Sequence, residues 1–376
     1  MKKNKNIKLL EKLGLLINII LTITLITVVV IRTNQLMNIF ETEYQVLIII
    51  LAGLIFYLTL YIQLIIHELG HLIFGLISKY KFSSFRIGNL ILVKNNKKIK
   101  LKLLKISGTG GQCIMIPPKS ANGKIPVILY NLGGALANII TAFIFIIFHI
   151  IVNDKVILAY IFDTLALFGI YFAALNGIPM KMGIIDNDGF NAISLSKDKS
   201  AQKAFLIQLK INEALSNNKR LKEMPAEWFE IDKNANLNNS LIAAILVLSC
   251  NRLLDEHEFK KANKKMDTIL KKETAIVGLH YNLLICDQIY CCLLENNVTE
   301  VKKLYNEATK NFMTSMKNYP SIIRTNYALS LLLDKDQTKA NNYLKQFQKC
   351  AKTHPYPSDI ISEKELISIA TAMTRQ

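Results

Sequence analysis

The sequence predicts a membrane α-helical bundle of about four transmembrane helices with a small membrane-associated β-hairpin, followed by a C-terminal cytosolic all-α helical-repeat domain. Two observations lead to this fold class. Hydrophobic residues make up 51% of the 376 residues, and every long apolar run lies before residue 190. The net charge of +18 divides into +11 for residues 1–190 and +7 for residues 191–376. This composition excludes a disordered basic protein, and six cysteines are too few for a disulfide scaffold of this length.

Four apolar segments are long enough to cross the ~30 Å hydrocarbon core of a bilayer, which takes about 20 residues of helix. They are residues 15–31, 46–77, 125–152 and 156–175. The first follows five lysines, as the apolar part of a signal peptide does. Because the polar sequence Arg32-Thr33-Asn34-Gln35 follows it instead of a small-residue cleavage site, we expect an uncleaved helix.

The charges beside these segments predict their orientation, because cytoplasmic loops carry an excess of lysine and arginine. Residues 78–125 hold eleven basic residues and no acidic one, and the N-terminus holds five lysines. Both regions face the cytoplasm if four helices cross the cell membrane and both termini lie inside. We therefore expect an N-terminal basic segment and first helix (1–45), a membrane core (46–195) and a cytosolic domain (196–376). The charge indicates contact with the lipid bilayer, and no nucleic-acid partner is expected because aromatic interleaving is absent.

The basic segment has the pattern of a β-hairpin, with strands over residues 86–93 and 98–106 joined through Asn95-Asn96. Its second strand alternates between lysines and apolar residues, which is typical of a half-buried strand. Two interpretations stay open: an amphipathic hairpin that only sets the topology, or one that also offers an edge to an extended peptide. The alternating residues are Lys98, Lys100 and Lys102 on one face and Ile99, Leu101 and Leu103 on the other.

The sequence His67-Glu68-Leu69-Gly70-His71 lies within the second apolar segment and has the pattern H-E-x-x-H. Residues four apart share a helix face, so both imidazoles can bind one metal ion. Glu68 is then placed to exchange protons with the attacking water. Ionisable residues in a membrane segment are costly and usually functional.

A catalytic zinc site usually takes a third protein ligand and keeps one open position. Asp186 and Asp188 both follow the fourth apolar segment, after a stretch in which Pro179 and glycines interrupt the helix. The predicted topology brings this stretch to the same cytoplasmic depth as His67. The residues themselves leave open which aspartate is the third ligand.

At this point the sequence resembles the site-2 protease family of M50-type intramembrane zinc metalloproteases, over roughly residues 46–195. Three motifs carry the resemblance: HELGH at 67–71, the small-residue stretch 133–138 ending in Asn138, and Asn176, Pro179 and Asp188-Gly189. The resemblance implies hydrolysis of transmembrane or membrane-held peptide substrates with Zn²⁺ as cofactor. It implies His67, His71 and Asp188 as metal ligands and Glu68 as the catalytic residue. Extra residues between Pro179 and Asp188 keep Asp186 as an alternative ligand.

Three polar residues in the membrane segments have two interpretations each. Asn138 and Asn176 either hold helices together or, as the resemblance implies, bind the substrate backbone or the oxyanion. Asp163 is either a buried acid with a partner or part of a substrate gate. The glycines of residues 133–138 have a simpler role, because small residues let two helices approach closely in lipid.

The second half contains three stretches that align at a constant offset of 39 residues. This period predicts three helical hairpins, a short α-solenoid that only loosely resembles tetratricopeptide repeats. Such a stack binds a protein or peptide partner or serves stability alone. Besides the protease, the sequence therefore allows a non-proteolytic membrane scaffold or peptide-handling protein that acts through its repeats. The aligned positions are Ala262, Val301 and Ala340; Met266, Tyr305 and Leu344; and Ile269, Ala308 and Phe347.

Overall fold

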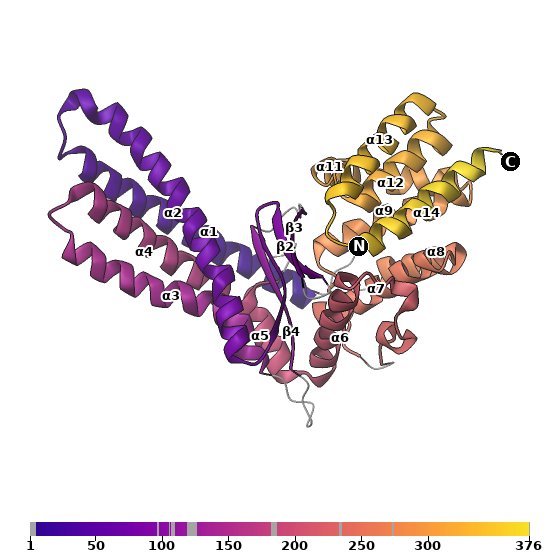
Figure 1. The fold of residues 1–376 in the computed structure, drawn as a ribbon, viewed down its shortest axis with the longest axis horizontal. Coiled ribbons are helices and arrows are strands. Elements are labelled where there is room, and N and C mark those ends of the chain that lie inside the picture. Colours follow the sequence, from indigo (N-terminus) through magenta and orange to yellow (C-terminus); the bar gives the residue numbers. More distant parts are fainter. Residues whose placement is uncertain are drawn as a thin grey trace.

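The computed structural model describes residues 5–95, 98–104, 106, 110–118, 126–181, 186–232, 235–272 and 274–375. Within these residues, four helices are long and apolar enough to cross a membrane, and they cover the four predicted segments. They lie together at one end of the molecule, the sheet follows, and the helices after residue 198 form the other end (Figure 1). The four are α1 (Lys5–Met37), α2 (Gln45–Ile77), α3 (Val127–Ile151) and α4 (Val156–Gly177).

Helix α1 runs along α4 and is joined to it by polar contacts. The hydroxyls of Thr33 and Tyr160 lie 2.8 Å apart. Near the same end of the pair, Arg32 Nε lies 3.1 Å from a carboxylate oxygen of Asp163. Asp163 is therefore an acid with a partner, the first of its two expected interpretations.

Helices α2 and α3 approach each other closely where both carry glycine. A Cβ atom at Gly70 would collide with the backbone oxygen of Gly133, and a Cβ atom at Gly133 would collide with Phe74. The close approach expected of the small residues at 133–138 is thus present. It brings the side chains of α3 directly against the HELGH segment of α2.

The basic segment forms a four-stranded antiparallel sheet in the order β3-β2-β1-β4, larger than the predicted hairpin. The predicted strand over residues 86–93 is wrong, because Gly88 has φ +57° and the chain turns there from β1 into β2. Asn96, in the predicted turn, lies outside the described residues. The strands are β1 (Lys81–Ile87), β2 (Leu90–Asn95), β3 (Lys98–Leu103) and β4 (Gly111–Ile116).

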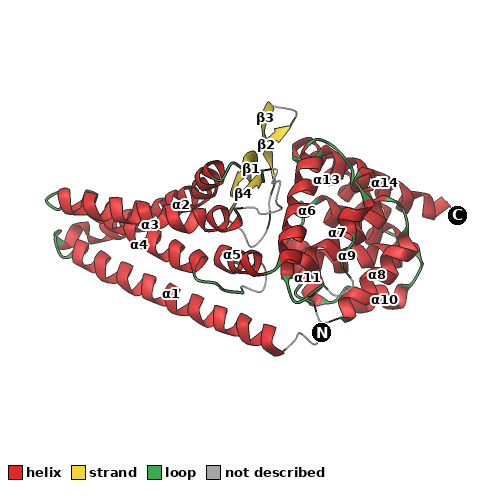
Figure 2. Ribbon diagram, turned by 90° about the horizontal axis from the view of Figure 1, so that it is seen from below, coloured by secondary structure: helices red, strands yellow, loops and turns green. Residues whose placement is uncertain are grey.

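Strand β3 is not half-buried as expected. Its apolar side chains are as open as its lysines, with Ile99 61% and Leu101 62% exposed. The reason is its place at the edge of the sheet, where the β2–β3 pair projects beyond the helices on both sides (Figure 2). Contact of this strand with the membrane interface stays a prediction.

The described part of the chain after residue 186 is helical. Three positions aligned by the 39-residue offset, Ala262, Val301 and Ala340, are fully buried. This agrees with the expected helix contacts, although the repeat architecture itself stays a prediction. A π-helical segment (Leu329–Leu333) follows α12, and short 3₁₀ turns lie at Thr42–Tyr44, Leu221–Glu223, Ala226–Phe229 and Met373–Arg375. The helices are α5 (Asp188–Lys197), α6 (Lys199–Ser216), α7 (Ser240–Asp255), α8 (Phe259–Lys271), α9 (Gly278–Leu294), α10 (Val298–Leu304), α11 (Glu307–Ser315), α12 (Pro320–Ala328), α13 (Gln337–Thr353) and α14 (Pro357–Ala372).

A buried arginine joins three of these helices. Arg324 on α12 is 1% exposed, and its guanidinium lies 2.5 Å from Asp287 on α9 and 3.0 Å from Glu363 on α14. We refer to these three residues as the Arg324 cluster. Burying charged groups is costly unless each has partners, so the cluster makes the packing of the three helices depend on Arg324.

Replacing Arg324 with Met is expected to lower the free energy of unfolding by about 3–5 kcal/mol, because two carboxylates would stay buried without their cation. Thermal unfolding of the full chain in detergent, followed by circular dichroism, measures the change. Lys271→Met is the matched control, because Lys271 forms an exposed pair with Asp267 on α8 that is worth about 0.5 kcal/mol or less. Equal stability of the two variants would contradict the prediction.

Candidate metal centre

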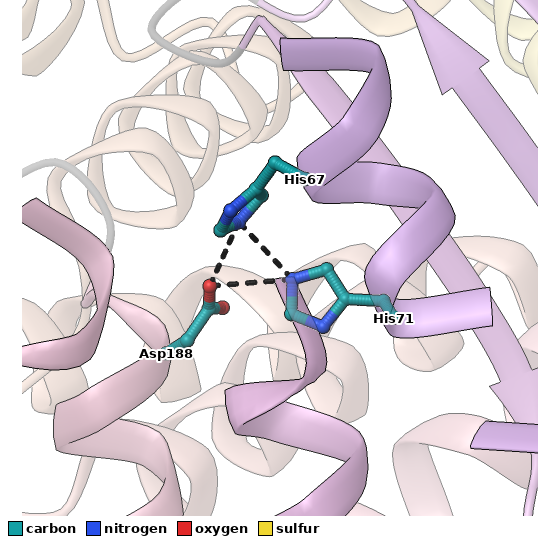
Figure 3. A group of neighbouring side chains, drawn as sticks. All are labelled: His67, His71 and Asp188. Atoms are coloured by element: carbon teal, nitrogen blue, oxygen red, sulfur yellow. Dashed lines mark hydrogen bonds and ion pairs between the residues drawn. The ribbon is translucent and has the colours of Figure 1, made fainter. Parts of the chain in front are cut away.

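Helix α2 carries His67 and His71 one turn apart, and α5 brings Asp188 to meet them (Figure 3). The Nε2 atoms of the two histidines lie 3.2 Å apart. The carboxylate oxygen Oδ2 of Asp188 lies 3.1 Å from Nε2 of His67 and 3.2 Å from Nε2 of His71. Three ligand atoms from two elements thus converge on one point.

These distances fit a zinc ion. Zinc binds histidine nitrogen and carboxylate oxygen at 2.0–2.2 Å with tetrahedral geometry, which separates neighbouring ligand atoms by about 3.3–3.5 Å. The three separations observed, 3.1 to 3.2 Å, are only slightly shorter. Two imidazoles and one carboxylate also form a donor set that zinc enzymes use while keeping a fourth position open.

The other ring nitrogens of both histidines have partners that fix the rings. The backbone oxygen of Tyr130 lies 2.9 Å from Nδ1 of His71, and Oδ1 of Asn138 lies 2.7 Å from Nδ1 of His67. An oxygen in each place accepts a hydrogen bond from the N–H at Nδ1, which leaves the lone pair on Nε2. Outer partners of this kind orient metal-binding histidines.

Asn138 on α3 is fully buried, and both ends of its amide have partners. Its nitrogen donates to the backbone oxygen of Gln63 at 3.0 Å and to the side-chain oxygen of Gln63 at 2.7 Å. Gln63 donates in turn to the backbone oxygen of Leu165 on α4. The geometry favours orientation of His67, since Asn138 is fully buried and its amide nitrogen already donates to Gln63. Contact of Asn138 with substrate stays a prediction. Sequence reasoning missed Gln63, although a polar residue one turn before His67 in an apolar helix was a usable signal.

Asn187 holds the start of α5 against the end of α4. Its amide donates to the backbone oxygens of Leu175 and Ile178, at 2.8 and 2.6 Å. Its oxygen accepts from the backbone N–H of Phe190, which makes it the N-cap of α5. Sequence reasoning missed this residue too, although an Asn just before a helix is a known capping signal. The cap fixes the next residue, Asp188, towards α2.

The two candidate aspartates have different surroundings. The carboxylate of Asp186 accepts a hydrogen bond from the hydroxyl of Ser240 on α7. Among the described residues, the group able to hold a metal contains Asp188 with the two histidines. Burial raises the pKa of Asp188, but the two histidines lower it by more than burial raises it. The net result is a pKa below the ordinary value of an aspartate. Its carboxylate is therefore ionised at neutral pH and available as a ligand.

Two further residues are expected at the site, Glu68 on α2 and Asn176 on α4. Glu68 is 6% exposed, and its carboxyl group packs against Gly111, the first residue of β4. Asn176, near the end of α4, donates to the backbone oxygen of Phe172 one turn earlier. Its contact with substrate stays a prediction.

A comparison with protein families shows the family of the chain. The family described as Peptidase family M50 matches residues 55–321, more than two thirds of the chain. The chain belongs to peptidase family M50. No curated protein and no solved structure matched it. The M50 match begins within α2, includes His67, Glu68, His71 and Asp188, and ends within α12.

Proposed function

We propose that this M50 peptidase is an intramembrane zinc metalloprotease that hydrolyses peptide bonds in transmembrane or membrane-held peptide substrates. The observation that carries the proposal is the convergence of Asp188 on His67 and His71, which lie beside Glu68 on a helix long and apolar enough to cross a membrane. Family membership supports the protease class, and the donor set supports zinc.

The residues of the site have separate tasks in this proposal. His67, His71 and Asp188 hold the metal, and Asn138 and Tyr130 hold the imidazole rings. A bound zinc ion would supply an activated water and polarise the carbonyl of the scissile bond. Glu68 takes a proton from that water and passes it to the nitrogen of the leaving amine. The peptide bond is thereby exchanged for a carboxylate and an amine.

The position of the site limits the form of the substrate. His71 lies six residues before the end of α2, which is about 9 Å along the helix. In a helical substrate the scissile carbonyl would be hydrogen-bonded within the helix and covered by side chains. The substrate must therefore be locally extended at the site. Strand β4 begins beside Glu68 and lies at the edge of the sheet, where an extended peptide can pair with it.

The experiment that tests this function joins two measurements on a Glu68→Gln strain: zinc content of the purified protein, and mapping of the membrane peptides that accumulate. A non-proteolytic scaffold predicts no accumulation and tolerates changes at His67 and Asp188. Proteolysis predicts accumulated substrates that the wild-type protein cleaves.

The hydrogen-bond chain behind His67 gives a second prediction. Asn138→Ala is expected to weaken zinc affinity about 10–100-fold, because the loss of an outer partner frees the His67 ring. Competition with a fluorescent zinc chelator measures the dissociation constant. Thr141→Ala on the same helix is the matched control, because the Thr141 hydroxyl bonds to the backbone of its own helix. Unchanged affinity in Asn138→Ala would contradict the orienting role.

A further inference from the structure

A cavity of about 470 Å³ lies between the sheet and the C-terminal helices. One wall contains Gln112 and Ile114 of β4, and α6, α7, α9, α12 and α14 contribute the others. The sheet lies between the membrane-spanning helices and the C-terminal helices, and the latter contribute most of the lining (Figure 1). Its volume falls in the range of ligand-binding sites, about 300–1,000 Å³.

The cavity is acidic, although the chain as a whole carries a net charge of +18. The Arg324 cluster lies in its wall with one cation and two carboxylates. Arg220, also in the wall, repeats the arrangement by lying 2.6 Å from Asp255 and 2.5 Å from Glu365. Asp359 adds a further carboxylate to the lining. The lining itself thus contains four carboxylates and two guanidinium groups. Glu365 lies outside the lining and also pairs with Lys222 and His257. Asp359 lies 3.3 Å from Nε2 of His354, which lines the cavity too.

Arg324 alone does not offset the cost of burying the two carboxylates of the Arg324 cluster in their ionised form. Burial raises the pKa of Asp287 and that of Glu363 above their ordinary values, more than Arg324 lowers them. A cation entering the cavity would stabilise both ionised forms. The charge balance therefore favours a positively charged ligand.

Within the described part of the chain, two buried side chains in the wall have hydrogen-bonding atoms that find no partner. They are Oδ1 of Asn251 on α7 and the hydroxyl of Ser358 on α14, which is 1% exposed. A buried polar atom without a partner costs free energy of folding. Both atoms can accept a hydrogen bond from an ammonium or guanidinium group, or from a peptide N–H.

The cavity is linked to the proposed catalytic residue through β4. Gly111 packs against Glu68, and the next residue, Gln112, lines the cavity. Alternate side chains of a strand point to opposite faces, so Gln112 and Ile114 face the cavity while Cys113 and Met115 are buried in the core. A peptide that runs along β4 from Glu68 would reach Ile114 after about three residues, or about 10 Å.

We propose that this cavity binds the basic, cytosol-facing flank of the substrate. The inference rests on the proposed function and deepens it by naming a feature of the substrate. Cytosolic flanks of membrane segments are rich in lysine and arginine, so the charge of the cavity complements the part of the substrate that leaves the membrane beside the sheet.

The test measures binding to the full chain carrying Glu68→Gln, so that no cleavage intervenes. The probes are a short fluorescent lysine-rich peptide and two control peptides of the same length. In one control every lysine is replaced by glutamate, and in the other by glutamine. The lysine peptide is expected to bind at least about tenfold more tightly than the glutamate peptide, with affinity falling as salt is raised. Asp359→Asn should weaken lysine-peptide binding about 3–10-fold, and Asp359→Lys should weaken it further.

Asp267→Asn is the matched control, since it removes the same charge from the exposed face of α8, outside the cavity. Equal binding of the lysine and glutamate peptides, or equal losses in Asp359→Asn and Asp267→Asn, would overturn the inference. Circular dichroism verifies that each variant is folded. Proteolysis without any charge preference would refute the cavity inference alone, whereas Asp359-dependent binding without proteolysis by the wild-type chain would refute the proposed function.

Discussion

The Glu68→Gln protein is expected to keep its zinc and to lose peptide cleavage by about 10²–10⁴-fold, the range of a general acid–base residue. The amide has the shape of the carboxylate but cannot accept the proton of the attacking water. The three ligand atoms belong to other side chains and keep their separations of 3.1 to 3.2 Å. Mass spectrometry of membrane peptides measures cleavage, and elemental analysis of purified protein measures zinc.

The matched control is Glu300→Gln, the same chemical change in an exposed pair with Lys303 on α10. This control should cleave at the wild-type rate. Retained cleavage in Glu68→Gln would remove Glu68 from the mechanism. Loss of zinc in the same variant would instead show that Glu68 supports the metal site, which its packing against the start of β4 would then explain.

The metal centre was predictable from the sequence where its geometry is local. Two residues four apart share a face of any α-helix, so the spacing of His67 and His71 alone predicts that they bind one metal ion. The four apolar segments were predictable for the same reason, since length and hydropathy decide membrane crossing.

Long-range partners were not predictable in this way. The bond from Asn138 to His67 joins α3 to α2, and Arg32 reaches Asp163 on α4. Each pairing depends on which helices pack together, and a single sequence does not contain that information. The sheet shows a different limit, because Gly88 turns the chain within residues 86–93, which were predicted as one continuous strand.

The choice between two aspartates is where the structure adds most to the sequence. Asp188→Asn is expected to weaken zinc affinity by more than the roughly 10–100-fold typical of a lost outer partner, because it removes a ligand. Asp186→Asn should leave the affinity unchanged, since an amide oxygen can still accept the hydrogen bond from Ser240. Both variants make the same change two residues apart, so general effects on the segment cancel in the comparison.

Chelator competition measures the zinc affinity of the two variants, and cleavage is a second readout. Together they decide which aspartate is the third metal ligand. The expected order follows from Asn187, whose cap on α5 directs Asp188 to the histidines while Ser240 holds Asp186 at α7. Zinc loss in Asp186→Asn with retention in Asp188→Asn would transfer the ligand role to Asp186. That result would require residues 186–188 to rotate against α4, and it would break the bonds of Asn187 to Leu175 and Ile178. An Asn187→Ala variant would then bind zinc as the wild type does, whereas the observed geometry predicts weaker binding.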